Sequence, residues 1–191
     1  MVMRIISGKY KNKEIFSSIK GVYSNIKPTT SKVKEAAFNI ISSISQKYSL
    51  VIQDLKFLDL CCGIGSIGIE AISRDFDTIY FIDNNYYSIA ITKYNLMLLK
   101  SSNYKVIQSN ILDLVITDGI LFDVIYLDPP YNMVITDEVL RSIKRFMHDK
   151  SFLIIETPKK IPLSALRGYD VILIKHYGHC TLNIIKTISN C

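Results

Sequence analysis

The sequence predicts an α/β protein built on a mostly parallel, Rossmann-like sheet with helices on both faces. From residue 54 onward, short apolar runs alternate with segments of helical periodicity, a pattern typical of parallel strands joined by helices. A glycine-rich turn follows the first of these runs. The last two runs, 171–175 and 181–185, are separated by only a short turn and predict a closing antiparallel hairpin.

The first 47 residues have a pattern of their own. Residues 3–7 and 14–17 are short extended candidates and predict a small β-hairpin. The segment 28–31, Pro-Thr-Thr-Ser, offers hydroxyl groups that can cap the start of a helix. Apolar residues then recur at helical spacing over 33–44, so one face of this helix is expected to be buried.

Beyond residue 54, strands and helices are expected to alternate. Strands are expected at 57–60, 78–82, 105–108, 122–127 and 152–156, and helices at 67–74, 88–100 and 137–147. Within the 88–100 segment, the residues expected to share one face are Ile89, Ala90, Tyr94, Met97 and Leu98. Ligands of such sheets bind beyond the carboxyl ends of the strands.

The net charge of +6 is concentrated at the start of the chain. Residues 1–47 hold nine Lys/Arg against two Glu, which leaves +7, and residues 48–191 hold 14 against 15 Asp/Glu, which leaves −1. Basic residues interleaved with aromatic ones in one segment indicate contact with the phosphates of a nucleic acid. The expected contacts are Arg4, Lys9, Lys11, Lys13, Lys27, Lys32 and Lys34.

The glycine turn reads Gly63-x-Gly65-x-x-Gly68 and lies between a predicted strand and a predicted helix. Asp83 ends the next predicted strand, where a carboxylate can accept hydrogen bonds from both hydroxyls of a ribose. The spacing alone is compatible with a structural turn, with NAD and with S-adenosylmethionine. Asp59 favours S-adenosylmethionine, because a carboxylate repels a pyrophosphate and attracts a cationic amino-acid end.

A second motif, Asp128-Pro129-Pro130-Tyr131, follows the predicted strand 122–127. Paired prolines also occur in rigid loops without chemistry. However, Asp128 and the carbonyl of Pro129 could accept both N–H bonds of an exocyclic base amine and orient its weakly nucleophilic nitrogen. Tyr131 could stack on the flipped base. A sulfonium cofactor already carries the leaving group, so this chemistry needs no metal.

Other residue types exclude several classes of protein. The four cysteines (Cys61, Cys62, Cys180 and Cys191) form no CxxC pair, which argues against a disulfide framework or a zinc site and for reduced thiols. The histidines at 148, 176 and 179 are not expected to bind a metal. No apolar stretch approaches the roughly 18 residues of a membrane span. We therefore expect a cytoplasmic protein with no membrane contact.

Taken together, these segments resemble the RsmD family of bacterial small-subunit (16S) ribosomal RNA guanine-N2 methyltransferases. The resemblance runs from Arg4 to about Lys186. Residues 4–8 resemble the opening hairpin of the family, and 27–35 resemble its Arg-Pro-Thr helix start. Residues 59–71 resemble its cofactor turn. The resemblance implies a class I methyltransferase fold with two parts: a basic extension, 1–47, that contacts RNA and closes over the cofactor, and a catalytic, cofactor-binding domain, 48–191.

The resemblance also implies roles for particular residues. It implies methyl transfer from S-adenosylmethionine, with S-adenosylhomocysteine as product, to the N2 amine of a guanine. The substrate would be ribosomal RNA within a small-subunit particle, and the enzyme a monomer. The segment 128–131 would hold the guanine. The implied cofactor contacts are Thr29, Thr30, Asp59, Cys61, Gly63, Gly65, Gly68, Asp83, Asn84, Asn110, Ile111 and Asp128.

Two alternatives remain open at this point. The same chemistry could act on adenine N6 in DNA or RNA, or on a glutamine side chain, and the chain could be a non-catalytic RNA-binding ribosome assembly factor. Lysines stand at 27, 32 and 34 where the family usually has arginine, which keeps the charge but loses bidentate phosphate geometry. Asp83 replaces the commoner Glu, which shortens the reach to a ribose.

Overall fold

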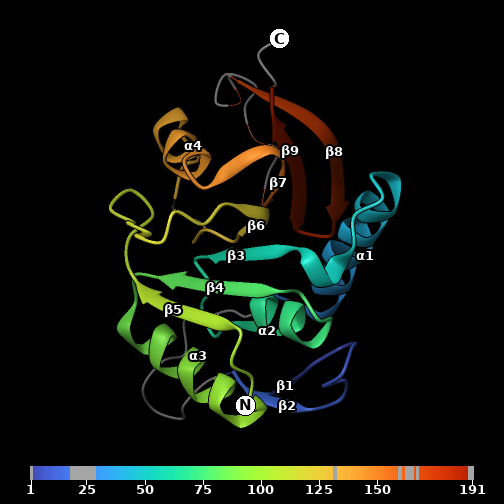
Figure 1. Cartoon of the computed structure of the whole chain (residues 1–191), viewed down its shortest axis with the longest axis vertical. Helices are drawn as coiled ribbons and strands as arrows, with labels where there is room; N and C mark the ends of the chain where they lie inside the picture. Colours follow the sequence, from blue (N-terminus) through green and yellow to red (C-terminus); the bar gives the residue numbers. More distant parts are fainter. Residues whose placement is uncertain are drawn as a thin grey trace.

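The computed structural model describes residues 2–17, 29–130, 133–158, 161, 166 and 168–188. Its centre is a seven-stranded sheet of order β5-β4-β3-β6-β7-β9-β8 (Figure 1). The first five strands of this order pair in parallel, and β9 pairs antiparallel with both β7 and β8. The expected closing hairpin is therefore confirmed. The strands are β3 (Lys56–Leu60), β4 (Thr78–Asp83), β5 (Tyr104–Gln108), β6 (Phe122–Leu127), β7 (Met147–Thr157), β8 (Tyr169–Tyr177) and β9 (Cys180–Thr187).

Helices cover both faces of this sheet, as expected. Phe57, Val124 and Ile154 face a cluster that includes side chains of α1, α2 and α3. Their neighbours in sequence point the other way, because side chains alternate along a strand, and pack with apolar residues of α4. The described helices are α1 (Ser31–Lys47), α2 (Ser66–Ser73), α3 (Tyr86–Leu99), α4 (Asp137–Lys144) and the 3-10 helix η1 (Ile52–Asp54). None of the helices in these parts of the chain is long and apolar enough to cross a membrane.

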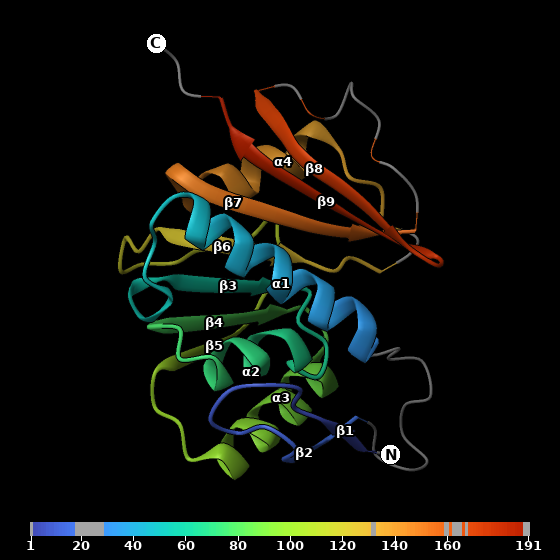
Figure 2. The same ribbon diagram turned by 90° about the vertical axis from the view of Figure 1, so that its right-hand side faces the viewer.

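The expected N-terminal hairpin is confirmed as a separate two-stranded sheet of β1 (Val2–Arg4) and β2 (Glu14–Phe16). It lies on α2 and α3, at the opposite end of the molecule from the β8–β9 hairpin (Figures 1 and 2). Its turn packs closely on α2: a side chain at Gly8 would place its Cβ 1.7 Å from the carbonyl oxygen of Ser73. Only glycine fits at this contact, and its φ of 83° also favours glycine.

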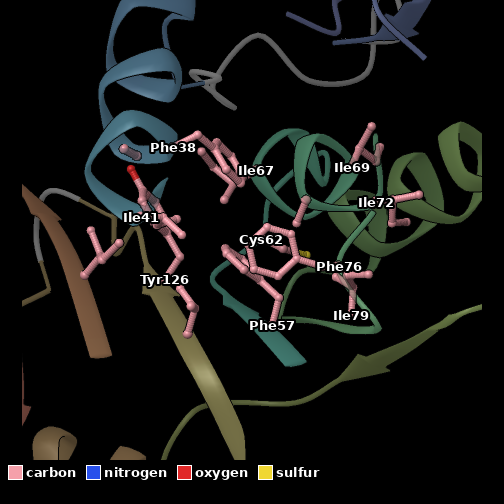
Figure 3. Close-up of a cluster of buried hydrophobic side chains, with 14 of the residues drawn as sticks. Phe38, Ile41, Phe57, Cys62, Ile67, Ile69, Ile72, Phe76, Ile79 and Tyr126 are labelled. Atoms are coloured by element: carbon pink, nitrogen blue, oxygen red, sulfur yellow. The ribbon is translucent and has the colours of Figure 1, made fainter. Parts of the chain in front are cut away.

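The helix α1 begins where its sequence indicates. The Thr30 side chain accepts a hydrogen bond from the backbone N–H of Val33 at the N-cap, and residues at helical spacing are buried against the sheet. Phe38 and Ile41 of α1 reach the same cluster as the α2 side chains (Figure 3). The N-terminal segment therefore shares its hydrophobic core with the sheet.

Two details of the expected helices are wrong. The predicted helix 137–147 ends at Lys144, and Met147 already belongs to β7. In α3, Tyr94 and Met97 are exposed, whereas Thr92 and Asn95 are fully buried. The helix α3 carries apolar residues on most of its sides, so the spacing of these residues does not identify its buried face. The buried polar pair is explained by its hydrogen bonds to the glycine turn.

Candidate active site at the carboxyl edge of the sheet

Four carboxylates lie along the carboxyl edge of the sheet, one at the end of each of β3, β4, β6 and β7. In parallel strands, residues in register point to the same face. Asp59 is in register with Phe81 of β4 and with Tyr126 of β6, and Tyr126 is in register with Ile154 of β7. Asp83, Asp128 and Glu156 lie two positions after Phe81, Tyr126 and Ile154, and side chains two positions apart in a strand point to the same face. All four therefore point to the face covered by α1 and α2: Asp59, Asp83, Asp128 and Glu156.

The glycine turn connects β3 to α2 through an unusual backbone path. Cys61, Gly63 and Gly65 have φ values of 57°, 55° and 79°, all in the left-handed region. The third glycine serves packing, because a Cβ at Gly68 would lie 2.2 Å from the ring of Phe81. The expected strand–turn–helix is confirmed, and the turn has a backbone path that brings it close to the strand ends.

Asp59 and Asp83 hold this turn from two sides. An oxygen of Asp59 accepts the backbone N–H of Gly68 at 2.8 Å. The two oxygens of Asp83 accept the backbone N–H groups of Gly63 and Asn85, each at 2.8 Å. A carboxylate has about four acceptor positions, so Asp83 keeps capacity for further donors.

The negative charges of the carboxylates at this edge are unfavourable in the isolated protein. Burial, and to a smaller extent the charges of Asp128 and Asp83, raise the pKa of Asp59 well above its ordinary value, although the Gly68 N–H opposes the shift. Burial likewise raises the pKa of Asp83. A cationic ligand placed here would favour the ionised forms of these carboxylates and would be attracted by them.

Two side chains of α3 support the turn from behind. The Thr92 hydroxyl donates to the carbonyl of Gly63 at 2.8 Å, and the Asn95 amide donates to the carbonyl of Ile64 at 3.1 Å. Sequence reasoning missed both residues. A signal was present, because Thr92 and Asn95 are polar, three positions apart and surrounded by apolar residues in a predicted helix.

Asp128 sits directly beside the turn. Its backbone N–H donates to the carbonyl of Leu60 at 3.3 Å, and its side chain accepts the hydroxyl of Thr29 at 3.0 Å. Burial first, and the charge of Glu156 second, raise the pKa of Asp128 to about 7, while the Thr29 hydrogen bond lowers it. The structure thus brings Thr29, at the start of α1, to the loop that follows β6.

The rest of this loop is described only in part. Pro129 is buried and Pro130 is exposed, and the Pro130 carbonyl accepts the N–H of Met133 at 2.8 Å. This bond closes the loop after the two prolines. Tyr131 lies outside the described residues.

Glu156 is a fourth acid that sequence reasoning missed. The phenol of the fully buried Tyr126 donates to it at 2.7 Å. The thiol of Cys180 also contacts Glu156. Burial, and to a smaller extent the charge of Glu156, raise the pKa of this thiol above its usual range. The available signal was an acid that directly follows the apolar run 152–155.

The other expected cofactor residues lie on neighbouring strand ends. Asn84 is exposed beside Asp83, and its carbonyl accepts the side-chain amide of Gln108 at 3.3 Å. Asn110 is exposed and Ile111 is buried, just beyond β5, where the chain leaves the sheet. The assignment of these three residues as cofactor contacts stays a prediction.

Most of the expected phosphate contacts are exposed. The hairpin cations Arg4, Lys9, Lys11 and Lys13 lie at the surface, and so does Lys32 in the first turn of α1. Arg4 and Lys9 are ion-paired with Glu14 and Asp75 at 3.2 and 2.8 Å. Lys27 lies outside the described residues.

The prediction for Lys34 is wrong. Its side chain is completely buried, and its ammonium lies 3.5 Å from a carboxylate oxygen of Glu70. It also donates to the carbonyl of Arg4 at 3.3 Å. Burial lowers the pKa of Lys34, although Glu70 opposes this. This lysine is an internal structural residue and cannot contact RNA.

The fold is that of class I methyltransferases. The structure matches an Escherichia coli protein, described provisionally as a methyltransferase, with a TM-score of 0.79 and 22% identity over the whole of both chains. It also matches a ribosomal protein L11 methylase from Lactobacillus delbrueckii subsp. bulgaricus, with a TM-score of 0.66 and 13% identity over 86% of this chain and 82% of the other. These identities are low, so the likeness shows the fold alone.

Within that class, the chain belongs to the RsmD family. The family model described as Conserved hypothetical protein 95 matches residues 3–186. A relative called Ribosomal RNA small subunit methyltransferase D, from Buchnera aphidicola subsp. Acyrthosiphon pisum, is 34% identical over 82% of this chain and 78% of its own length. The protein of that name from Escherichia coli K12 is 26% identical over 81% of this chain and 74% of its own length.

Proposed function

We propose that this protein transfers a methyl group from S-adenosylmethionine to the exocyclic N2 amine of a guanine in small-subunit ribosomal RNA. The observation that carries the proposal is the position of Asp128, which is held beside the glycine turn by Leu60 and Thr29. The names of the relatives support ribosomal RNA as the substrate. The family resemblance supports guanine N2 as the target.

The acidic edge fits a cationic nucleoside cofactor. When bound, S-adenosylmethionine supplies an electrophilic methyl group on a positively charged sulfur. Asp83 would accept hydrogen bonds from ribose hydroxyls. The negative edge formed with Asp59 would attract the cationic part of the ligand, whereas it would repel the pyrophosphate of a nicotinamide dinucleotide.

The loop 128–130 would position the target amine. Asp128 and the carbonyl of Pro129 would each accept one N–H bond, which fixes the nitrogen in the orientation needed for attack. A carboxylate with a pKa of about 7 is also matched to take the proton that leaves the nitrogen as the new N–C bond forms, because a general base works best with a pKa near the working pH.

Replacing Asp128 with Ala is the direct test. We expect methyl transfer to fall by about 100-fold or more, a loss typical of removing one preorganised hydrogen-bonding group. The assay follows labelled methyl from S-adenosylmethionine into small-subunit particles that lack the modification, with duplex DNA as a competing substrate. The control is Asp113→Ala, an exposed acid that belongs to none of the four strand ends.

Mass analysis of the product nucleosides identifies the target. N2-methylguanosine supports the proposal, whereas N6-methyladenosine would assign the same chemistry to another amine. A D128A protein that methylates within threefold of the natural chain would refute the role of Asp128.

A further inference from the structure

A groove of about 490 Å³ lies between α1 and β8. Figures 1 and 2 both show α1 lying alongside the β8–β9 hairpin. No residue of the glycine turn and none of the four edge carboxylates contributes to its lining. Its lining includes Lys32, Glu35, Lys47, Lys175 and Tyr177.

The lining combines positive charge with apolar and aromatic surface. Lys32, Lys47 and Lys175 are exposed and face one acid, Glu35, so the groove carries a net charge of about +2. Tyr177 adds a partly exposed ring. Proteins that hold a single nucleic acid strand use this combination: cations follow the phosphates, and an aromatic ring stacks on a base.

One end of the groove adjoins the loop 128–130. Lys32 lies three residues after Thr29, whose hydroxyl donates to Asp128. On the other wall, Tyr177 pairs with Cys180. Cys180 lies two positions before Leu182, the partner of Glu156 in β7, and the neighbouring pair Leu127–Ile155 places Glu156 beside Asp128.

The far end is marked by Lys47, 15 residues along α1 from Lys32. A rise of about 1.5 Å per residue puts these two lysines about 22 Å apart along the helix axis. The groove therefore leads from the methylation site outward along α1.

We propose that this groove binds the sugar–phosphate backbone of the RNA strand on one side of the target base. This inference rests on the proposed function, since it takes RNA as the substrate of the same site. Lys32, Lys175 and Lys47 contact phosphates along the same strand, and Tyr177 stacks on a base next to the flipped one. The groove adds three contacts, Lys47, Lys175 and Tyr177, that lie outside the basic hairpin.

The test is the salt dependence of RNA binding by the triple variant Lys32→Gln, Lys47→Gln, Lys175→Gln. The probe is a fluorescein-labelled single-stranded RNA of about 20 nucleotides, titrated by anisotropy at about 50 to 200 mM KCl. Each lost phosphate contact should reduce the slope of log K against log salt by about 0.7, so the triple variant should lose about 2 units. Its affinity near 100 mM KCl should fall about tenfold or more.

The matched control is Lys144→Gln, an exposed lysine of α4 on the opposite face of the sheet. It should leave slope and affinity unchanged, and circular dichroism should show that all variants fold. A triple variant that keeps the natural slope, or a control that loses as much as one groove lysine, would overturn the proposal. It would also fall if light scattering showed a dimer that the triple variant dissolves, because the groove would then hold a second copy of the chain.

Tyr177 gives an independent reading of the same site. Tyr177→Leu should weaken binding of the probe about tenfold, and Tyr177→Phe should restore it, since stacking needs the ring and not the hydroxyl. Equal affinity of the Leu and Phe variants would contradict stacking.

The two proposals fail separately. If the triple variant loses RNA binding but the natural chain methylates no ribosomal RNA, the groove proposal stands and the proposed function is wrong. Loss of methyl transfer in D128A, together with a triple variant that binds RNA normally, would do the reverse.

Discussion

At the scale of single residues, Asp128 shows a conflict between chemistry and stability. In the proposed reaction it is ionised and accepts the proton of an amine. However, burial first, and the charge of Glu156 second, raise its pKa to about 7 from an ordinary value of 3.8. Folding therefore favours the protonated form. The contribution of this group to stability is fully present below about pH 4 and is lost as the pH rises through 7.

The variant Asp128→Asn removes this titration while preserving the shape of the side chain. We expect its free energy of unfolding to rise relative to that of the natural chain as the pH increases from about 5 to about 8. Urea unfolding of both proteins at the two pH values measures the difference. A difference that stays constant with pH, or that changes in the opposite direction, would show that Asp128 does not titrate in this range.

Single residues were predictable where the chemistry was local. Asp59, Asp83 and Asp128 each lie in or directly after a short apolar run, so the parallel sheet alone brings them to one edge. Glu156 follows the same rule and could have been found with it. Lys34 could not, because the burial of its charge depends on Glu70, 36 positions later in the chain.

At the scale of elements, Glu70 joins three of them. Its two oxygens accept the backbone N–H groups of Ile6 and Ser7, each at 2.9 Å, which holds the N-terminal hairpin on α2. The same carboxylate pairs with Lys34 of α1 and with Arg74 at the end of α2. A completely buried carboxylate with four such partners is satisfied, and without it the buried charge of Lys34 would have no opposite charge beside it.

We therefore expect Glu70→Leu to cost about 3–5 kcal/mol of the free energy of unfolding, because it leaves the charge of Lys34 buried and unpaired. The double variant with Lys34→Met should recover much of this loss. Chemical denaturation of the single, double and natural chains measures these terms, with Glu138→Gln, an exposed acid of α4, as the control. A loss below about 1 kcal/mol for Glu70→Leu would place it among ordinary surface substitutions.

Elements were predictable to the extent that periodicity is one-sided. The helix α1 has apolar residues on one face, and its start was expected at the segment 28–31, where the structure has it. The helix α3 is apolar on most sides, so its existence was predictable and its orientation was not. The missing information was tertiary: Thr92 and Asn95 are buried because the glycine turn needs donors for its carbonyl oxygens.

At the scale of the whole molecule, the site lies where the strand order reverses. Strands β3, β4 and β5 run outward in one direction, and β6 and β7 run outward in the other, so β3 and β6 are neighbours at the centre. Ligands of open α/β sheets bind at such a reversal. The glycine turn after β3 and the loop 128–130 after β6 meet there for this reason. The sequence predicted the strands, and the register that makes them adjacent came from the structure.

A ligand that bridges this reversal should stabilise the entire chain. At 100 times its dissociation constant, S-adenosylmethionine should add about 2.7 kcal/mol, which is about 5–10 °C in Tm for a chain of this size. Differential scanning fluorimetry measures the shift, and Asp83→Ala should reduce it. An equal shift with NAD would contradict the assignment of the cofactor.

The position of β9 has a consequence for how the chain is made. This strand follows β8 in sequence but lies between β7 and β8, so β8 leaves the ribosome before β9, its neighbour among the described strands. Until β9 arrives, β7 exposes an unpaired backbone edge along an apolar strand, which is the kind of surface through which nascent chains aggregate. Translation that stalls before residue 180 should therefore yield an insoluble product.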